Sequence, residues 1–425
     1  MKRPNSFFTQ LPLHTIHGAT VILDVDGTIV ADRQEQISPE ALAKIAEIKQ
    51  NHTVFISSNG SPKNADEFAR LAGVKMIVGK KPFIASFRSQ IAADESITVI
   101  GDKWITDGLL ARRLKADFIQ VKRIGGAQDS RMARFSYLVD SAVSACLPFI
   151  WLARPWHWVK NLLVFAPIFF AGKILSAASL GDTCLAFGIF SLAASTVYIL
   201  NDIFDREADA LHPKKSKRPL AANEISLFGA LVFAVALAGI ACFLVTKIPA
   251  VAPPILLYVA LNIVYSRWLK HVATIDVVTV ASFYILRVLV GGSAAHVPLS
   301  PWIMLCTFFG ALFVVVGKRR AELGQKARRA VLERYSSQAL DLMLAISVGL
   351  AIISYGIWSI IGHSSSYLVY STVFVVIALF RVLNLIYLSP ERAESPDVLV
   401  FTDAWILGSL LSWAVFVSFL FYQKV

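Results

Sequence analysis

The stretch that decides the fold is "LAFGIFSLAASTVYIL" at 185–200, which runs directly into "NDIFDREAD" at 201–209. The first part carries no charge, and a helix of about 20 such residues is long enough to cross a bilayer. Asp202, Asp205 and Asp209 are spaced i, i+3 and i+7, so a continuous helix would carry them on one face. Like charges at this spacing repel by roughly a few tenths of a kcal/mol per pair, so the cluster predicts a cationic partner. Mg²⁺ bridging a diphosphate is the natural candidate, and a solvated helix end is the alternative.

The composition extends the membrane prediction to most of the chain. Of 425 residues, 56% are hydrophobic and 16% are charged, whereas soluble proteins are about half apolar and a quarter charged. The mean hydropathy is +0.60. Apolar runs start near residue 137, so the residues before it are expected to form a soluble domain and the rest a helical membrane domain. The expected spans are 156–174, 180–204, 227–246, 251–268, 272–292, 301–317, 342–361, 367–388 and 401–421.

The net charge of +12 falls mainly in the loops on one side of these spans. Loops on the other side carry little beyond Lys173 and Lys247, and the positive-inside rule makes the basic side cytoplasmic. Residues 1–18 lack an apolar core long enough for a secretory signal, so we expect the soluble domain in the cytosol and the C-terminus outside. Because membrane topology accounts for the charge, no nucleic-acid partner is expected.

Polar clusters end four apolar stretches of the soluble domain. These are "ATVILDVDGTIV" (19–30), "VFISSNG" (54–60), "VGKKP" (78–82) and "TVIGDKWITDG" (98–108). Helical stretches alternate with them at 39–50, 61–72 and 105–115. This alternation predicts a parallel α/β sheet, in which ligands bind at the carboxyl ends of the strands.

The polar residues at these strand ends are suited to phosphoryl transfer. Asp24 is a candidate nucleophile toward phosphorus, and Asp26 is a candidate general acid and base. Ser58 and Lys81 are candidate phosphate-binding residues, and Asp102 is a candidate Mg²⁺ ligand. A carboxylate nucleophile, a metal and a lysine are parts that phosphoryl transfer uses. A turn acid or a helix cap is the alternative for any one of these residues.

The pieces "DVDGT", "SSN", "KKP" and "GDKWITD", in this order, resemble the haloacid-dehalogenase (HAD) superfamily of phosphatases over about residues 18–125. The likeness is greatest to the short capless group that acts on phosphatidylglycerophosphate-like lipids, because the gaps leave no room for a cap. The resemblance implies a HAD-like Rossmannoid fold with Asp24 as the aspartyl-phosphate nucleophile and Asp26 as the acid and base. The implied substrate contacts are Ser58, Asn59 and Lys81, and the implied Mg²⁺ ligands are Asp24, Asp26 and Asp102, with Asp107 beside them. A degenerate, non-catalytic domain is the alternative.

Cations and polar residues surround the acidic cluster, and charges within apolar spans are expected to face a polar cavity. The candidate substrate-binding residues are Lys160, Asn161, Asn201, Lys215, Arg218, Arg267, Lys270, Asp276, Arg287, Lys318 and Arg319, with Lys214 and Lys217 in the same basic run. The plainer interpretations are a positive-inside loop at 214–218, an ion pair between Asp276 and Arg287, and snorkelling cations at 317–325.

"NDIFDREAD", together with "YSRWLKHVATID" at 265–276, resembles the UbiA superfamily of intramembrane prenyltransferases over about residues 137–425. Within it, "RPWHWVKN" and "GKRRAEL" look most like the decaprenyl-phosphate phosphoribosyltransferase branch. The superfamily's usual second acidic motif has paired aspartates, whereas Asp276 stands alone here, and this departure favours the phosphoribosyl branch.

This resemblance implies a nine-helix all-α bundle whose Mg²⁺-diphosphate site lies at the cytoplasmic end of the bundle. The implied catalytic metal ligands are Asp202, Asp205 and Asp209. It also implies phosphoribosyl pyrophosphate (PRPP) and a polyprenyl phosphate as substrates, a bacterial cytoplasmic (inner) membrane location, and a role in cell-wall arabinan synthesis.

The two predicted domains suggest consecutive reactions. Transfer from PRPP leaves a 5-phosphate on the lipid-linked ribose, and the HAD-like domain is predicted to remove it. The expected domains are 1–128 for the phosphatase, 129–152 for a linking interfacial helix and 153–425 for the transferase. Two alternatives stay open: a UbiA-type prenyltransferase acting on a prenyl diphosphate and an aromatic or lipid acceptor, and a transporter of polyprenyl-linked or phosphorylated solutes. The sequence also leaves open the prenyl length and the formation of a homo-oligomer.

Overall fold

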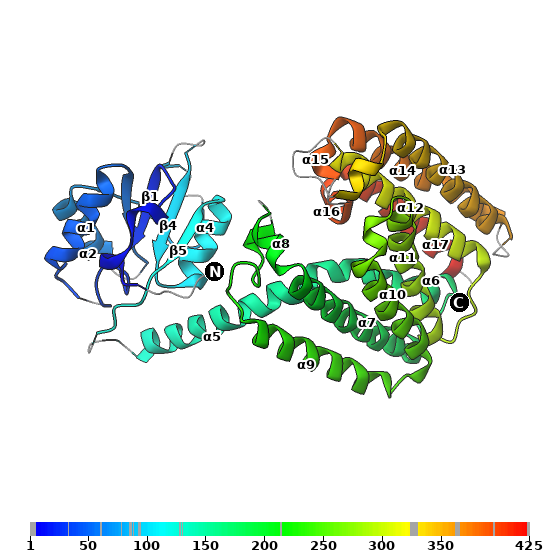
Figure 1. Ribbon diagram of the computed structural model, residues 1–425, viewed down its shortest axis with the longest axis horizontal. Helices are drawn as coiled ribbons and strands as arrows, with labels where there is room; N and C mark the ends of the chain where they lie inside the picture. Colours follow the sequence, from blue (N-terminus) through cyan, green and yellow to red (C-terminus); the bar gives the residue numbers. More distant parts are fainter. Residues whose placement is uncertain are drawn as a thin grey trace. The chain divides into compact units, whose positions relative to one another are not determined.

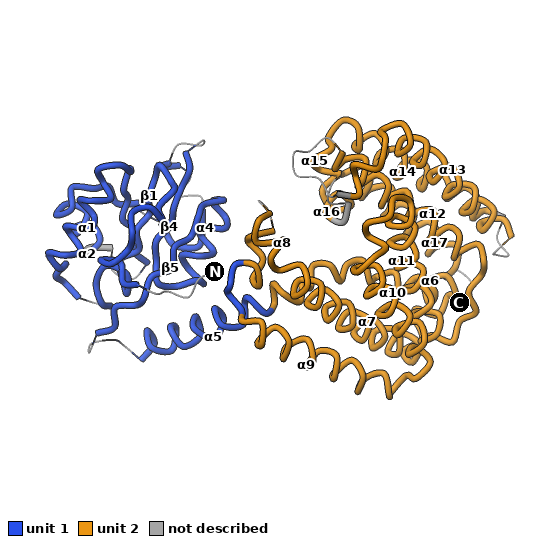
Figure 2. The backbone as a smooth tube through the Cα atoms, viewed as in Figure 1, with its two compact units in different colours: residues 1–149, 222–225 blue, residues 150–221, 226–425 orange. Residues whose placement is uncertain are grey.

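The computed structural model divides the chain into two compact units (Figure 2). The first comprises residues 1–149 and 222–225, and the second comprises residues 150–221 and 226–425. The structure describes residues 6–32, 34–59, 62–77, 79–84, 87, 89–91, 95–126, 129, 131–212, 215–323, 330–361, 366–393 and 396–422.

A five-stranded sheet forms the centre of the first unit, in the order β3-β2-β1-β4-β5, with every neighbouring pair parallel. The strands are β1 (Thr20–Asp24), β2 (Thr53–Ser57), β3 (Lys75–Met76), β4 (Ile97–Gly101) and β5 (Asp117–Gln120). Asp24 and Ser57 are partners in register, so the segments that follow β1 and β2 leave the sheet at the same edge. The predicted parallel sheet is therefore present. Its edge strand β5 is short and partly exposed, and the sequence analysis does not predict it.

Helices cover both faces of this sheet (Figure 1). They are η1 (Phe8–Gln10), η2 (Leu13–Thr15), α1 (Pro39–Lys49), α2 (Pro62–Ala72), the π-helical turn η3 (Trp104–Gly108) and α4 (Leu109–Leu114). Successive strand residues point to opposite faces, so Val21 joins the core cluster of α1 and α2, whereas Ile22 joins the cluster that includes Leu110 of α4. Helix α1 begins where the Ser38 side chain accepts a hydrogen bond of 3.1 Å from the Ala41 amide.

Most of the long apolar helices of the chain lie in the second unit. Within the described residues, nine segments are long and apolar enough to cross a membrane. They are α5 (Arg131–Ala153), α7 (Ala177–Phe204), α9 (Leu227–Val245), Pro249–Arg267 with η6 and α10 (Ala252–Arg267), α11 (Ile275–Ala294), α12 (Pro301–Glu322), α13 (Ser337–Ile361), Tyr367–Leu388 with α14 (Thr372–Leu388), and α17 (Ala404–Tyr422). Shorter helices connect them: η4 (Pro155–Phe165), α6 (Ala166–Phe170), α8 (Arg206–Ala210), η5 (Lys215–Lys217), η6 (Pro249–Val251), η7 (Leu269–His271), η8 (Ala330–Arg334), η9 (Ser366–Ser371), α15 (Pro390–Ala393) and α16 (Pro396–Thr402).

The predicted number of spans is found, but the first predicted span is wrong. Residues 156–174 form the 3₁₀ helix η4 and the short helix α6 in place of one long helix. Pro167 cannot donate a backbone hydrogen bond, and the chain turns at Gly172, whose φ is +66°. Hydropathy records the apolar length of this segment but not these interruptions. Helix α5, expected to be an interfacial linker, is long and apolar enough to be among the candidate spans, and residues 131–149 of it belong to the first unit.

Helix α7 lies at the centre of the packing that positions the acidic cluster. It contacts η4, α9, α10 and α11, and its buried core includes Phe190, which packs on Tyr258 with ring centroids 4.5 Å apart. A second core, with Phe313 and Leu344, joins α12 to α13. Helix α7 ends at Phe204, where Asp205 is the C-cap, and α8 starts at the next residue.

Candidate active sites

The break at Asp205 separates the three aspartates that the sequence analysis placed on one helical face. Asp202 and Asp209 are buried, at 3% and 2% exposure, whereas the Asp205 side chain is 41% exposed. Asp202 lies in the last turn of α7 and Asp209 in α8, so the change of direction between the helices decides how the carboxylates approach one another.

Arginine and lysine side chains neutralise each of these carboxylates. Arg154 Nη2 lies 2.6 and 2.7 Å from the two carboxylate oxygens of Asp202. Arg218 bridges the buried pair, with Nη1 at 3.0 Å from Asp202 Oδ1 and 2.5 Å from Asp209 Oδ2. The other two contacts are Lys215 to Asp209 at 3.3 Å and Lys270 to Asp205 at 3.1 Å. The arginine and lysine side chains relieve the repulsion between carboxylates that the sequence predicts. Together with the carboxylates they form a site that contains both phosphate-binding cations and metal-binding oxygens.

Arg154 is the residue of this site that the sequence analysis missed. It precedes Pro155 and adopts a left-handed backbone conformation, with φ +54° and ψ +55°, which is uncommon outside glycine. The turn is fixed to α7 because Ser195 Oγ donates to the Ala153 carbonyl at 2.7 Å and accepts from Trp158 Nε1 at 3.0 Å. Only its place in "RPWHWVKN" could have singled it out.

The lone Asp276 is paired differently from the sequence interpretation. It is fully buried and accepts hydrogen bonds from Arg319 Nε at 2.9 Å and from the Tyr335 hydroxyl at 2.6 Å. Arg319 also contacts Glu322 at 3.1 Å. The interpretation that Asp276 pairs with Arg287 is therefore wrong, because the two residues lie three turns apart on α11 and bind partners on other helices.

Arg287 and Asn161 form a buried polar pair within the bundle. Arg287 Nε donates to Asn161 Oδ1 at 2.9 Å, and Asn161 Nδ2 donates to Ser191 Oγ at 3.0 Å. The guanidinium also lies 5.1 Å from the centroid of the Phe190 ring. Arginine in a membrane helix needs such partners, because an unpaired charge in lipid is costly.

The remaining predicted residues are distributed around these groups. Asn201 accepts a hydrogen bond of 2.7 Å from Ser266, Arg267 is exposed, and Lys318 is partly buried. Lys160 borders an apolar cavity of about 600 Å³ whose wall also includes Leu163, Tyr284, Cys306 and Phe401. Lys214 lies outside the described residues. Apolar side chains form most of the lining of this cavity, and Lys160 is the charged residue among them.

In the first unit, the sheet edge brings the predicted phosphoryl-transfer residues together. Lys81 Nζ contacts the carboxylate of Asp24 and lies 2.6 Å from Asp107 Oδ1. The Ser58 hydroxyl donates to Asp26 Oδ2 at 2.5 Å. Asn59 holds the Lys81 backbone through two hydrogen bonds, of 2.8 Å with its amide nitrogen and 3.0 Å with its carbonyl oxygen. All four motifs therefore meet at one place.

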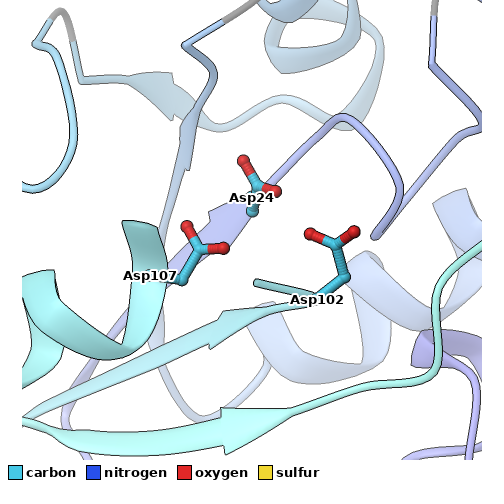
Figure 3. A group of neighbouring side chains, drawn as sticks. All are labelled: Asp24, Asp102 and Asp107. Atoms are coloured by element: carbon cyan, nitrogen blue, oxygen red, sulfur yellow. The ribbon is translucent and has the colours of Figure 1, made fainter. Parts of the chain in front are cut away.

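Three carboxylates in this cluster are arranged as a metal site would require. Oxygens of Asp24, Asp102 and Asp107 all lie within 4.8 Å of one another and face a common space (Figure 3). Asp102 Oδ2 is buried and has no hydrogen-bond partner among the described residues, so it is free to ligate a cation. Burial and the charge of Asp107 raise the pKa of Asp24 to about 7, although Lys81 opposes this shift. Burial and the charges of Asp24 and Asp107 likewise raise the pKa of Asp102. A divalent cation would favour the charged forms, and the donor set therefore fits one.

The sequence analysis placed Asp26 in the metal site, whereas the structure places Asp107 beside Asp24 and Asp102. Asp107 follows β4 by one helical turn and is completely buried. The motif "GDKWITD" places Asp107 near Asp102, but spacing alone does not distinguish Asp107 from Asp26 as a ligand.

Comparisons with known proteins give consistent results for the second unit. The UbiA prenyltransferase family matches residues 162–402. Decaprenyl-phosphate phosphoribosyltransferase of Mycobacterium tuberculosis is 35% identical over 281 residues, which are 61% of this chain and 89% of that protein. The protein of the same name from Mycolicibacterium smegmatis is 38% identical over 222 residues, covering 48% of this chain and 68% of that one. A UbiA homologue from Archaeoglobus fulgidus, solved with GPP and Mg²⁺, covers 64% of this chain and 99% of its own, with a TM-score of 0.50 at 19% identity, a likeness of fold alone.

Proposed function

Since the chain belongs to the UbiA prenyltransferase family, we propose that its membrane domain transfers 5-phosphoribose from PRPP to a polyprenyl phosphate. The observation that carries the proposal is the similarity to the two mycobacterial phosphoribosyltransferases, which spans most of the length of each. The acidic cluster with its arginine and lysine partners supports it, because PRPP presents both a diphosphate and a 5-phosphate. The proposed acceptors are polyprenyl phosphates whose chains are close in length to that of decaprenyl phosphate.

In this proposal, the site between α7 and α8 binds the donor. Asp202, Asp205 and Asp209 would hold Mg²⁺, which supplies positive charge to the diphosphate of PRPP. Arg154 and Arg218 hold the carboxylates of Asp202 and Asp209 in place, and their remaining N–H groups would donate to phosphate oxygens. Lys215 and Lys270 would add phosphate contacts at the same site.

The proposed reaction is a displacement at the anomeric carbon of ribose. A phosphate oxygen of the acceptor forms a bond to this carbon while the bond from the carbon to the diphosphate oxygen breaks, and diphosphate leaves with the electron pair. The acceptor phosphate is already an anion, so no side chain has to remove a proton. The carbon gains oxocarbenium character, and the cationic side chains stabilise the charge that develops on the leaving group.

The acceptor would occupy the cavity that Lys160 borders. Its apolar wall suits a prenyl chain, and Lys160 would attract the phosphate at the end of that chain. Lys318 and Arg267 remain further candidates for this phosphate. The donor and acceptor sites are proposed to open on the cytoplasmic side of a bacterial inner membrane, where PRPP and the HAD-like domain are expected.

We also propose that the first unit is a phosphatase that removes the 5-phosphate left by the transfer. Asp24 would attack phosphorus, Asp26 would protonate the leaving ribose oxygen, and water would then release phosphate from Asp24. Lys81 lies against Asp24 and would hold the phosphate oxygens, with Ser58 and Asn59 beside it. Mg²⁺ held by Asp24, Asp102 and Asp107 would neutralise charge on the phosphate. The product would be polyprenylphosphoryl ribose.

The proposal is tested with the full chain in detergent, Mg²⁺, ribose-labelled PRPP and decaprenyl phosphate. We expect label to enter the lipid fraction and to be lost in Asp202→Asn, while Asp182→Asn, at the other end of α7, transfers label normally. Asp24→Asn should transfer label but accumulate the lipid that carries two phosphates. If no label reaches lipid and a prenyl diphosphate is consumed with an aromatic or lipid acceptor, the chain is an ordinary UbiA-type prenyltransferase. Movement of an unchanged solute across proteoliposomes would indicate a transporter.

A further inference from the structure

Two side chains of α5 reach the loops of the proposed phosphatase site, although α5 lies beyond the HAD-like motifs in the sequence. Asp140 is 4% exposed, and its two carboxylate oxygens accept hydrogen bonds from the backbone amides of Trp104 at 3.2 Å and Ile105 at 2.7 Å. The Tyr137 hydroxyl donates to Asp32 Oδ1 at 3.1 Å. We propose that Asp140 and Tyr137 are positioning residues of the phosphatase, an inference that rests on the proposed phosphatase function.

Asp140 holds the turn that presents Asp107. The π-helical turn η3 starts at Trp104, and the first amides of a helix lack partners within it. Asp140 supplies an acceptor for two of these amides from outside the motif. Asp107, three residues further along, is fully buried and lies 2.6 Å from Lys81. Any movement of the turn would displace a carboxylate of the three-residue metal site.

Tyr137 fixes the other side of the same site. Its ring is held by Lys103, with Nζ 3.9 Å from the ring centroid, and by Arg123, with Cζ at 3.1 Å. Gly27, in the "DVDGT" turn, has a φ of +82°, and a Cβ there would collide with both Asp102 Oδ2 and the Tyr137 hydroxyl. The tyrosine hydroxyl therefore packs against the turn that follows the nucleophile, beside the free oxygen of Asp102.

The two residues are spaced i and i+3, so they lie on one face of α5 and act together. One contacts the loop after β1, and the other contacts the turn after β4. Outer residues that orient metal ligands commonly change metal affinity or activity by about 10- to 100-fold when they are removed. A phosphatase domain that ended at residue 128, as the sequence suggests, would therefore lack Tyr137 and Asp140.

The experiment compares Asp140→Ala, Asp140→Asn and Tyr137→Phe with the parent, all as full chains. Phosphate release from p-nitrophenyl phosphate is measured against Mg²⁺ concentration, and deuterium exchange of amides 103–108 is followed by mass spectrometry. In Asp140→Ala we expect faster exchange in this segment and a Mg²⁺ requirement about 10- to 100-fold higher. Asp140→Asn keeps one good acceptor oxygen and should recover part of both effects. Tyr137→Phe keeps the stacked ring and should give a smaller shift in Mg²⁺ requirement.

The controls separate positioning from general damage. Lipid labelling from PRPP should be unchanged in all three variants, and Glu40→Ala, an exposed acid on α1, should match the parent throughout. If Asp140→Ala has the parent's Mg²⁺ requirement and exchange rates while the parent releases phosphate, the positioning role is wrong. A loss of maximal rate at an unchanged Mg²⁺ requirement would also overturn it. If the parent itself releases no more phosphate than Asp24→Asn, the phosphatase function fails, and exchange at 103–108 still tests the contact with Asp140.

Discussion

Arg154 gives the sharpest test of how the acidic cluster works. Its guanidinium contacts both oxygens of the buried Asp202, and Arg218 is the second cation on that carboxylate. A hydrogen bond to a charged group is worth about 1.5–3 kcal/mol. In the proposed complex Arg154 also donates to a phosphate oxygen of PRPP, so we take the loss of transition-state binding in Arg154→Ala as one such bond. At about 1.4 kcal/mol per factor of ten, kcat/KM for PRPP should fall about 10- to 150-fold.

The assay is the initial rate of label transfer to decaprenyl phosphate at varied PRPP concentration. Arg154→Lys keeps the charge but loses the planar fork, so its loss should be smaller than that of Arg154→Ala. Arg154→Gly removes the same side chain and suits the left-handed backbone at φ +54°, so equal losses in the Ala and Gly variants assign the effect to the guanidinium. Lys247→Ala, an exposed cation after α9, should match the parent. Full activity in Arg154→Ala, or an increase, would refute the reasoning.

Three further predictions concern stability, the acceptor and the donor. In a denaturation assay, Asp276→Ala should lower the free energy of unfolding by about 3–5 kcal/mol, because the buried Arg319 loses the carboxylate that it contacts. Asp341→Ala removes the partly exposed pair with Arg320 and should lower the same free energy by only about 0–1 kcal/mol. Alkylation of Cys306, which lines the apolar cavity, should slow when decaprenyl phosphate is added but not when free PRPP is added. PRPP binding, followed by isothermal titration, should tighten at least tenfold when Mg²⁺ is present, and this gain should disappear in Asp209→Asn.

The sequence predicts best what depends on local pattern. The apolar run at 185–200 predicts α7, and the alternation of strands and helices predicts the parallel sheet. It fails at 156–174, because apolar length does not reveal where Pro167 and Gly172 interrupt a helix. It also omits β5, a short edge strand with little burial.

The sites divide in the same way. The identity of the acids in each cluster is readable from spacing, but their partners depend on tertiary packing. Arg154 reaches Asp202 only because of an uncommon backbone conformation, and Asp276 finds Arg319 and Tyr335 on other elements of the fold. The helical period of 3.6 residues predicts that Asp205 lies on the same helical face as Asp202. In the structure, however, α7 ends before Asp205, and the Asp205 carboxylate contacts Lys270. Charge balance could be predicted, but the particular cation could not.

The two sites share one electrostatic arrangement. In the first unit Lys81 bridges Asp24 and Asp107, and in the second Arg218 bridges Asp202 and Asp209. In the first unit one lysine between two buried carboxylates leaves a net negative charge, which favours entry of a divalent metal. In the second unit Arg154 and Lys215 also contact Asp202 and Asp209, so cations already balance these carboxylates before a metal or a phosphate binds. Once a metal is bound, the positive charge of Lys81 or Arg218 is no longer needed to balance the carboxylates. A phosphate group can then supply the matching negative charge. Metal and phosphate therefore each improve the site for the other, and this mutual dependence is the physical reason to expect PRPP to bind more tightly with Mg²⁺.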